Sequence, residues 1–198
     1  MNYTDAITHL TATDPVLGAI IAAVGPCTLV AEPRGLTTLV RSIIAQQISV
    51  QAAATIMARL ETKLGELSPA TLLACPPEEL RAVGLSGQKV RYLYDLAERV
   101  ATGALDIDEL TQLDDEGAIA ALVKVKGIGR WTAEMYLIFA LGRLDLLPVD
   151  DLGLRQSAQQ FYALPVPPSP AALRAIAEPW RPYRSVASWY LWRGRRLP

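Results

Sequence analysis

Residues 122–135 contain the strongest fold signal of the chain. They read Leu122-Val123-Lys124-Val125-Lys126-Gly127-Ile128-Gly129-Arg130-Trp131-Thr132-Ala133-Glu134-Met135. Gly127 and Gly129 bracket an apolar residue, and glycine supplies the positive φ and the bare backbone that a tight turn needs. Ile128 would anchor this turn in the core, and a new helix would begin near Arg130. The stretch therefore predicts two helices joined by a short turn.

Positive charge surrounds the predicted turn. The first turn of a helix presents unpaired N–H groups that attract anions, and Lys124, Lys126 and Arg130 lie at the same place. Such a turn can hold the phosphates of DNA without reading any base. Two glycines alone are a weak signal, because an ordinary connection between two helices can contain them.

The rest of the chain also has helical periodicity, and alternating strand patterns are absent. Apolar residues recur at helical spacing at Leu39, Ile43, Ile44, Ala53, Ile56, Met57 and Leu60. Helix starts are expected at Pro77, after Ser86, near Asp114, after Ser169 and at Arg181. The predicted fold class is all-α.

Composition excludes several classes of site. The chain has 198 residues, two cysteines and one histidine. Cys27 and Cys75 are too few for a four-cysteine metal or iron–sulfur centre and are expected to be core thiols. The lone His9 excludes a multi-histidine zinc site. No apolar run is long enough to span a membrane, and the first residues lack the basic segment of a secretory signal, so we expect a cytoplasmic protein, associated with the nucleoid if bacterial.

The net charge of −1 hides an asymmetry between the two ends. No Lys or Arg precedes Arg34, whereas no acid follows Glu178. The basic residues after Glu178 are Arg181, Arg184, Arg193, Arg195 and Arg196. This end of the chain can meet phosphates, although a solvated arginine-rich terminus is the simpler interpretation.

Several separated blocks together resemble the helix-hairpin-helix DNA glycosylase superfamily, and within it the 3-methyladenine DNA glycosylase II branch. The blocks are residues 40–49, residues 84–86 with Lys89, and residues 126–133, 148–155 and 180–185. The resemblance implies one glycosylase core over residues 1–198, with the hairpin at about residues 122–135. It also implies a two-lobed helical bundle with a cleft between the lobes, corresponding to the short form that lacks the additional mixed domain of larger members.

The resemblance implies an enzyme of base excision repair. Its members flip a damaged base, here an alkylated one of the 3-methyladenine or 7-methylguanine type, out of duplex DNA and hydrolyse the N-glycosidic bond. The catalytic aspartate starts the helix after the hairpin. Alignment on residues 152–155 favours Asp151, whereas counting from Pro148 selects Asp150. Either carboxylate could instead only cap that helix.

A flipped base needs flat apolar walls on which to stack. By resemblance these are Trp131 and Trp192, although both could be core residues, with Trp180 and Trp189 the more typical core candidates. Related enzymes can carry a pocket tyrosine where this chain has Met135, followed by Tyr136. Relatives that also nick the strand carry a lysine at the position of Trp131. We therefore expect a monofunctional glycosylase that leaves an abasic site.

The resemblance also predicts the contacts with DNA. The hairpin would bind the backbone through Lys124, Lys126, Gly127, Ile128, Gly129, Arg130 and Thr132, assisted by Arg184. The loop at residues 46–49 would fill the gap left by the flipped nucleotide, with Gln47 or Ile48 as the wedge and Ser49 beside it. No cofactor is required, and a structural Na⁺, K⁺ or Mg²⁺ could bind the backbone carbonyls of Val123, Val125 and Ile128.

The expected partner is damaged double-stranded DNA, bound by a monomer without contact to a membrane. Two alternatives belong to other classes of protein. One is a non-catalytic helix-hairpin-helix module that binds DNA and uses Asp150 and Asp151 only as caps. The other is a helical protein-interaction domain, which would show no salt-dependent affinity for duplex DNA.

Overall fold

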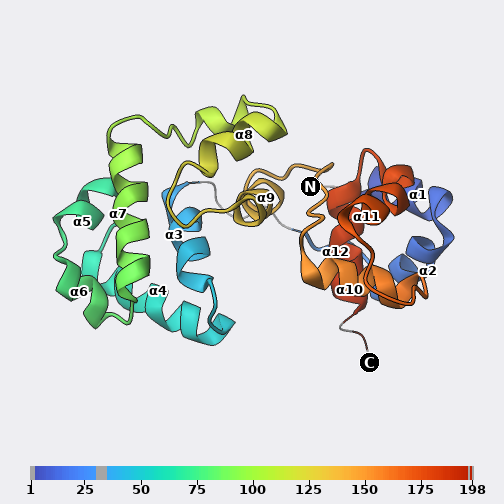
Figure 1. Ribbon diagram of the computed structural model, residues 1–198, viewed down its shortest axis with the longest axis horizontal. Helices are drawn as coiled ribbons and strands as arrows, with labels where there is room; N and C mark the ends of the chain where they lie inside the picture. The colour runs from blue at the N-terminus through green and yellow to red at the C-terminus, as the bar shows by residue number, and fades with distance from the viewer. Residues whose placement is uncertain (1–2, 30–34, 196, 198) are drawn as a thin grey trace. The chain divides into compact units, whose positions relative to one another are not determined.

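The computed structural model describes residues 3–29, 35–195 and 197. Over these residues the chain folds into twelve α-helices and two short 3-10 helices, and none of them forms a strand (Figure 1). This confirms the all-α prediction. Within the same residues, no helix has both the length and the apolar character needed to cross a membrane.

The chain divides into two compact units. The first, which we call the hairpin unit, comprises Glu32–Tyr136. Its helices are α3 (Leu36–Ala45), α4 (Val50–Leu64), α5 (Pro69–Ala74), α6 (Pro77–Ala82), α7 (Gly87–Ala101), η1 (Glu109–Thr111), α8 (Asp115–Leu122) and most of α9 (Arg130–Phe139).

The second, which we call the terminal unit, combines Met1–Ala31 with Leu137–Pro198. It contains the end of α9 and the helices α1 (Thr4–Thr13), α2 (Pro15–Val24), α10 (Leu152–Phe161), α11 (Pro170–Ile176), η2 (Glu178–Trp180) and α12 (Arg184–Gly194).

Helix α7 is the centre of the hairpin unit and packs against α3, α5 and α6. It begins where the sequence predicts, because the Ser86 hydroxyl accepts the Lys89 N–H at 3.3 Å. Its inward face carries Leu93 and Leu96, which are fully buried. The Asp114 carboxylate caps α8 in the same way, accepting the Gly117 N–H at 2.8 Å. Side-chain caps of this kind supply partners for orphan N–H groups at helix starts.

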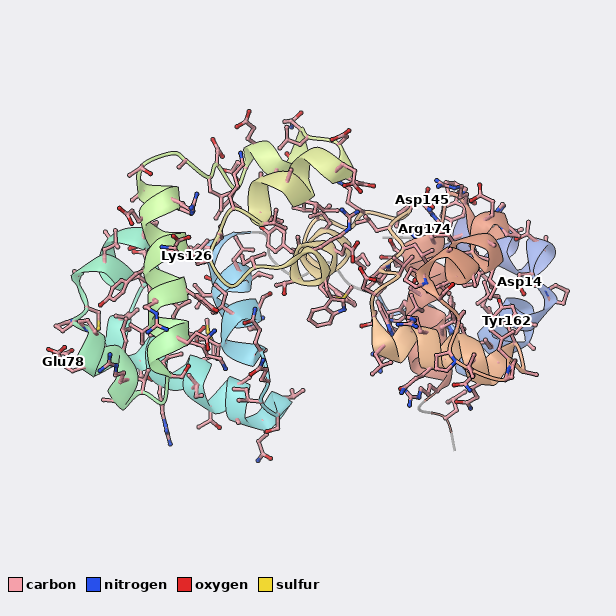
Figure 2. All side chains as sticks on the ribbon, viewed as in Figure 1. Asp14, Glu78, Lys126, Asp145, Tyr162 and Arg174 are labelled. Atoms are coloured by element: carbon pink, nitrogen blue, oxygen red, sulfur yellow. The ribbon has the colours of Figure 1, made fainter. Side chains whose placement is uncertain are left out.

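The terminal unit is organised around a buried carboxylate. Asp14 caps α2, where its Oδ1 accepts the backbone N–H of Val16 at 2.9 Å. Its Oδ2 accepts the Tyr162 hydroxyl at 2.5 Å and the Trp180 indole N–H at 2.8 Å (Figure 2). Burial, and then the bond to Asp14, raise the pKa of Tyr162 far above its ordinary value. One carboxylate thus joins the start of α2 to the ends of α10 and η2.

Three details refine the sequence predictions. Helix α12 begins at Arg184 rather than Arg181, because Arg181 precedes Pro182 and takes an extended conformation with ψ of 138°. Trp180 and Trp189 are core residues, as predicted. Cys75 is buried as predicted, whereas Cys27 is only half-buried.

Candidate functional site

The turn between α8 and α9 is built around Gly127. Its φ of 85° lies in the left-handed region, and a Cβ at this position would stand 2.1 Å from Cδ2 of the Tyr92 ring. Ile128 is buried, and its N–H donates to the Val125 carbonyl at 3.1 Å. Only glycine satisfies both the conformation and the close approach to Tyr92.

Gly129 plays a different part from the one predicted. Its φ is outside the left-handed region, and a Cβ there would meet nothing within 4 Å. The prediction of two positive-φ glycines is therefore wrong for Gly129, because the chain has already turned at Gly127. The Gly129 carbonyl accepts the Ala133 N–H at 3.0 Å, so this residue already belongs to the start of α9. Gly129 is exposed, and its backbone can be approached closely from solvent.

Two of the predicted basic contacts lie on the outside of the turn. Lys124 and Lys126 are both exposed. The Lys126 N–H donates to Asp95 on α7 at 2.9 Å, and its Nζ lies 3.3 Å from the same carboxylate, which Arg99 also contacts. Burial raises the pKa of Asp95, but the hydrogen bonds from Lys126 and Arg99 lower it by more. The pKa of Asp95 therefore lies below its ordinary value. Asp95 therefore anchors the turn to α7.

Arg130 is committed to two ion pairs within the hairpin unit. Its Nη1 donates to Glu116 on α8 at 3.0 Å, and its Nε donates to the buried Glu134 at 3.1 Å. The hydrogen bonds to Glu116 are the main cause that raises the pKa of Arg130. These ion pairs hold α8 against α9. The Arg130 guanidinium would have to leave Glu116 before it could bind a phosphate in a bidentate manner.

The side chains that follow on α9 divide by exposure. Trp131 is 46% exposed, whereas Thr132 is 7% exposed and offers little surface to DNA. Tyr136 is buried at 1%, and its hydroxyl accepts the Gly35 N–H at 3.3 Å. A ring without an exposed face cannot stack on a base, so the half-buried Met135 is the better wall candidate of that pair.

The predicted wedge loop is a loop, as expected from its polar residues. Gln47 has a φ of 59°, in the left-handed region, and Ile48 is 37% exposed. Ser49 caps α4 by accepting the Ala52 N–H at 3.2 Å. At the start of α4, Val50 is 88% exposed. The loop thus presents apolar surface to solvent.

In the terminal unit, the two candidate aspartates have different surroundings. Asp151 caps α10, where its Oδ1 accepts the Leu154 N–H at 2.5 Å and the Trp192 indole N–H at 2.9 Å. Gly153 makes room for this arrangement, because a Cβ there would lie 3.2 Å from the same oxygen. Asp150 is exposed. The structure therefore gives Asp151 a fixed orientation and a tryptophan partner that the sequence did not predict.

Trp192 is held from two sides. Its indole N–H binds Asp151, and its ring stacks with Phe139 at a centroid distance of 6.0 Å and an interplanar angle of 29°. It is half-buried, in contrast to the buried Trp180 and Trp189. Both tryptophans predicted to meet the base thus keep part of their surface exposed.

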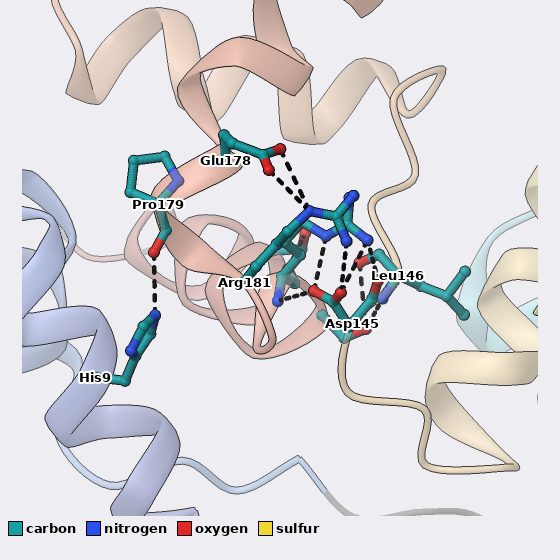
Figure 3. Close-up of polar contacts among 9 residues, drawn as sticks. His9, Asp145, Leu146, Glu178, Pro179 and Arg181 are labelled. Atoms are coloured by element: carbon teal, nitrogen blue, oxygen red, sulfur yellow. Dashed lines mark hydrogen bonds and ion pairs between the residues drawn. The ribbon is translucent and has the colours of Figure 1, made fainter.

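Arg184 supports the chain that leads to Asp151. Its Nε donates to Oδ1 of Asp145 at 2.7 Å, and its Nη2 donates to Oδ2 at 3.0 Å. Arg181 binds the same carboxylate at 3.0 Å (Figure 3). The Ser185 hydroxyl accepts the Leu146 N–H at 2.9 Å. The Arg184 side chain is only 16% exposed, so most of it is used inside the terminal unit. Of the other basic residues near the C-terminus, Arg193 lies over the Trp189 ring, and Arg196 is outside the described residues.

The predicted cation ligands are the backbone carbonyls of Val123, Val125 and Ile128. The Val125 carbonyl accepts the Ile128 N–H, and a carbonyl oxygen has a second lone pair that could bind a cation. Val123 is exposed beside it. Among the described residues, no group of three or more His, Cys, Asp and Glu side chains could hold a metal ion. The carbonyl site stays a prediction.

Comparison with known proteins gives consistent results. The family described as "HhH-GPD superfamily base excision DNA repair protein" matches residues 40–182. The chain is 32% identical over 203 residues to the alkylbase DNA glycosidase-like protein mag2 of Schizosaccharomyces pombe, an alignment that covers 99% of this chain and 95% of that one.

Solved structures agree as well. The 3-methyladenine DNA glycosylase Mag1 of Schizosaccharomyces pombe, in complex with abasic DNA, aligns at a TM-score of 0.86 and 32% identity, covering 98% of both chains. The DNA-3-methyladenine glycosidase of Bacillus halodurans aligns at a TM-score of 0.87 and 35% identity, covering 97% of this chain and 90% of that one.

Proposed function

Because the chain belongs to the HhH-GPD superfamily of base excision DNA repair proteins, we propose that it is a monofunctional DNA glycosylase acting on alkylated bases. It hydrolyses the N-glycosidic bond of a base flipped out of duplex DNA and leaves an abasic site. The observation that carries this proposal is the carboxylate of Asp151, oriented by the start of α10 and by the Trp192 indole. The similarity to 3-methyladenine DNA glycosylases over nearly the whole chain supports the choice of substrate class.

Hydrolysis of the N-glycosidic bond is favoured by a negative charge next to the sugar. As the bond between C1′ and the base nitrogen breaks, its electron pair leaves with the base, and positive charge develops on C1′ and the ring oxygen. The Asp151 carboxylate stabilises that charge, as a preorganised anion does best in a site whose dipoles are already fixed. Water then adds its oxygen to C1′ and loses a proton, for which the same carboxylate can serve as acceptor. The products are the free base and an abasic sugar.

Two hydrogen bonds to one oxygen make Asp151 suited to this role. The two donors, the Leu154 N–H and the Trp192 indole N–H, fix the orientation of the carboxylate. Asp150 is exposed and has no comparable support. We therefore propose Asp151 as the catalytic residue.

The aromatic side chains suit an alkylated base. Such bases often carry positive charge, and the electron-rich face of an indole attracts a cation by about 0.5–2 kcal/mol. Trp131 of the hairpin unit and Trp192 of the terminal unit are each partly exposed, and each is proposed as a surface on which a flipped base can stack. Trp131 has no amine with which to form a Schiff base, so strand cleavage by that route is not expected.

The hairpin unit is proposed to hold the DNA backbone. Lys124, Lys126 and the exposed Gly129 backbone would contact phosphates, and Gln47 or Ile48 would fill the gap in the stack. A cation bound to the hairpin carbonyls would strengthen the binding of the DNA backbone. The hydrolysis itself is proposed to need no cofactor. We expect the enzyme to bind damaged DNA as a monomer.

The test is a panel of duplexes, each with a single lesion, incubated with the protein and then treated with alkali to cut at abasic sites. The panel includes 3-methyladenine and 7-methylguanine together with an undamaged duplex. Base release from at least one alkylated duplex, without cleavage before alkali, is the expected result. Failure to release a base from any duplex would overturn the proposed activity, and borohydride trapping of a covalent adduct would overturn the monofunctional mechanism.

A further inference from the structure

Lys89 binds the end of a helix other than its own. It lies in the first turn of α7, and its ammonium donates to the Ile44 carbonyl at 2.7 Å and to the Gln46 carbonyl at 2.9 Å. The last carbonyls of α3 have no partners within that helix, and a cation is favoured at this end of the dipole. Lys89 therefore fixes the point at which the chain leaves α3 and enters the loop of residues 46–49.

The position of Lys89 is a costly one for a lysine. Burial lowers its pKa, which indicates that the ammonium has been withdrawn from water to reach the two carbonyls. A lysine placed only for solubility or for a phosphate would keep its charge in solvent. Its hydrogen bonds are directed instead at the backbone of the loop.

The loop is tied in turn to the hairpin. The Gln46 side-chain amide donates to the Gly127 carbonyl at 2.8 Å, across 81 residues of sequence. Gly127 also packs against Tyr92, which stands three residues after Lys89 on α7 and therefore on the same face of that helix. Lys89 holds the loop, Tyr92 supports the turn, and Gln46 joins the loop to the turn.

A small cavity marks the place where these three elements meet. Its volume is about 320 Å³, and its lining includes Gln47 and Ile48 of the loop, Lys89 and Tyr92 of α7, and Gly127 of the turn. The proposed wedge and the proposed phosphate-binding turn therefore belong to one connected body. The Gln46 side chain joins the loop to the turn, and the Lys89 side chain joins the loop to α7.

We propose that Lys89 and Gln46 are positioning residues that set the spacing between the loop inserted into the DNA stack and the turn that holds the DNA backbone. This inference rests on the proposed function. The proposal assigns no chemical step to either residue. When the link is broken, the turn still binds phosphates, but the loop can shift relative to the turn, and insertion into the stack becomes weaker.

The experiment separates backbone binding from insertion. Lys89→Met removes both donated bonds, Lys89→Arg keeps a donor, and Gln46→Leu removes only the bond to Gly127. The matched control is Lys63→Met, which breaks an exposed ion pair with Glu79 elsewhere in the hairpin unit. Two duplexes are used, one undamaged and one carrying a tetrahydrofuran abasic analogue opposite 2-aminopurine. Anisotropy gives the affinity for each duplex, and 2-aminopurine fluorescence reports unstacking.

The expected result is a selective loss. Lys89→Met and Gln46→Leu should bind the undamaged duplex within about twofold of wild type, while their preference for the abasic duplex falls on the order of tenfold. Their fluorescence rise should shrink, whereas Lys89→Arg and Lys63→Met should behave as wild type. If Lys89→Met proves unfolded by circular dichroism, Gln46→Leu decides the question, because it leaves the lysine in place.

Two results would overturn the inference. One is that folded Lys89→Met and Gln46→Leu match Lys63→Met on both duplexes. The other is that they lose affinity for both duplexes equally, which would indicate a general loss of DNA binding. These readouts do not involve base release, so a wild-type protein that unstacks the abasic duplex but excises nothing would contradict the proposed function and leave the positioning role standing.

Discussion

Replacement of Gly127 by alanine adds one methyl group at the tightest point of the hairpin. The new Cβ would lie 2.1 Å from Cδ2 of Tyr92 and 2.5 Å from Cε2, well inside van der Waals contact. The residue would also have to keep a φ of 85°. Replacement of Gly129 is the matched control, because its φ is ordinary and the same methyl group would meet nothing within 4 Å.

The magnitude follows from these two strains. Holding a non-glycine residue in the left-handed region costs about 1–2 kcal/mol, and overpacking against the Tyr92 ring costs about 1–3 kcal/mol more. Gly127→Ala should therefore lower the free energy of unfolding by about 2–5 kcal/mol, whereas Gly129→Ala should change it by about 0.5 kcal/mol or less. Adding Tyr92→Ala to Gly127→Ala should recover the overpacking part, so the double variant should be less destabilised than the sum of the singles.

Urea denaturation followed by far-UV circular dichroism measures these differences. Equal stability of Gly127→Ala and Gly129→Ala would refute the reasoning, as would additivity of Gly127→Ala and Tyr92→Ala. The same pair of variants is informative for DNA binding. Gly129→Ala keeps the fold but places a methyl group on the exposed backbone, so a weaker affinity for duplex DNA would locate a phosphate at that residue.

Three other predictions follow from the contacts of single side chains. Trp192→Phe keeps an aromatic ring beside Phe139 but removes the donor to Asp151, so single-turnover base release should slow by about tenfold or more, and an unchanged rate would separate Trp192 from the chemistry. Arg184→Met should lower the free energy of unfolding by about 1–3 kcal/mol, because it leaves the Asp145 carboxylate without its main partner. Lys124→Met should leave the stability unchanged and should reduce the slope of log affinity for DNA against log salt concentration by about one. The reverse pattern in denaturation and salt-titration experiments would contradict the assignment. Asp95 has a pKa that is lower in the folded protein, so its contribution to stability is present above its unfolded pKa of about 3.9 and is lost as the pH falls through the folded value. The stability gap between wild type and Asp95→Asn should thus be constant near neutral pH and narrow below about pH 4, and a gap that widens there would be inconsistent with this sign.

Local signals in the sequence were sufficient to predict most of the fold. Ser86 and Asp114 start their helices with side-chain caps because capping depends on residues only three apart. Gly127 turns the chain as its neighbours suggest. Gly129 shows the limit of that reasoning, since two glycines in one motif look alike in sequence and only the path of the backbone shows which of them needs a positive φ.

The site was harder to predict because its partners come from distant parts of the chain. The sequence predicts a phosphate contact for Arg130, and in the structure its side chain binds Glu116 and Glu134. Of these two pairs, only the one with Glu134, four residues further along the helix, has a spacing that the sequence displays. No spacing rule connects Arg184 to Asp145, or Trp192 to Asp151, which lie 39 and 41 residues apart. The resemblance to a family nevertheless led to Asp151, and the structure adds the reason why its orientation is fixed.

The most direct test of the account compares Asp151→Asn with Asp150→Asn on an alkylated duplex from which the wild-type protein releases the damaged base. Asparagine keeps the size of the side chain and can still accept a hydrogen bond from the start of α10, so both variants should remain folded. Single-turnover base release by Asp151→Asn should be slower by a factor on the order of 100 or more, since a preorganised charge is lost, while Asp150→Asn should stay within a few fold of wild type. Full activity of Asp151→Asn, or loss of activity only in Asp150→Asn, would contradict the assignment of the catalytic residue.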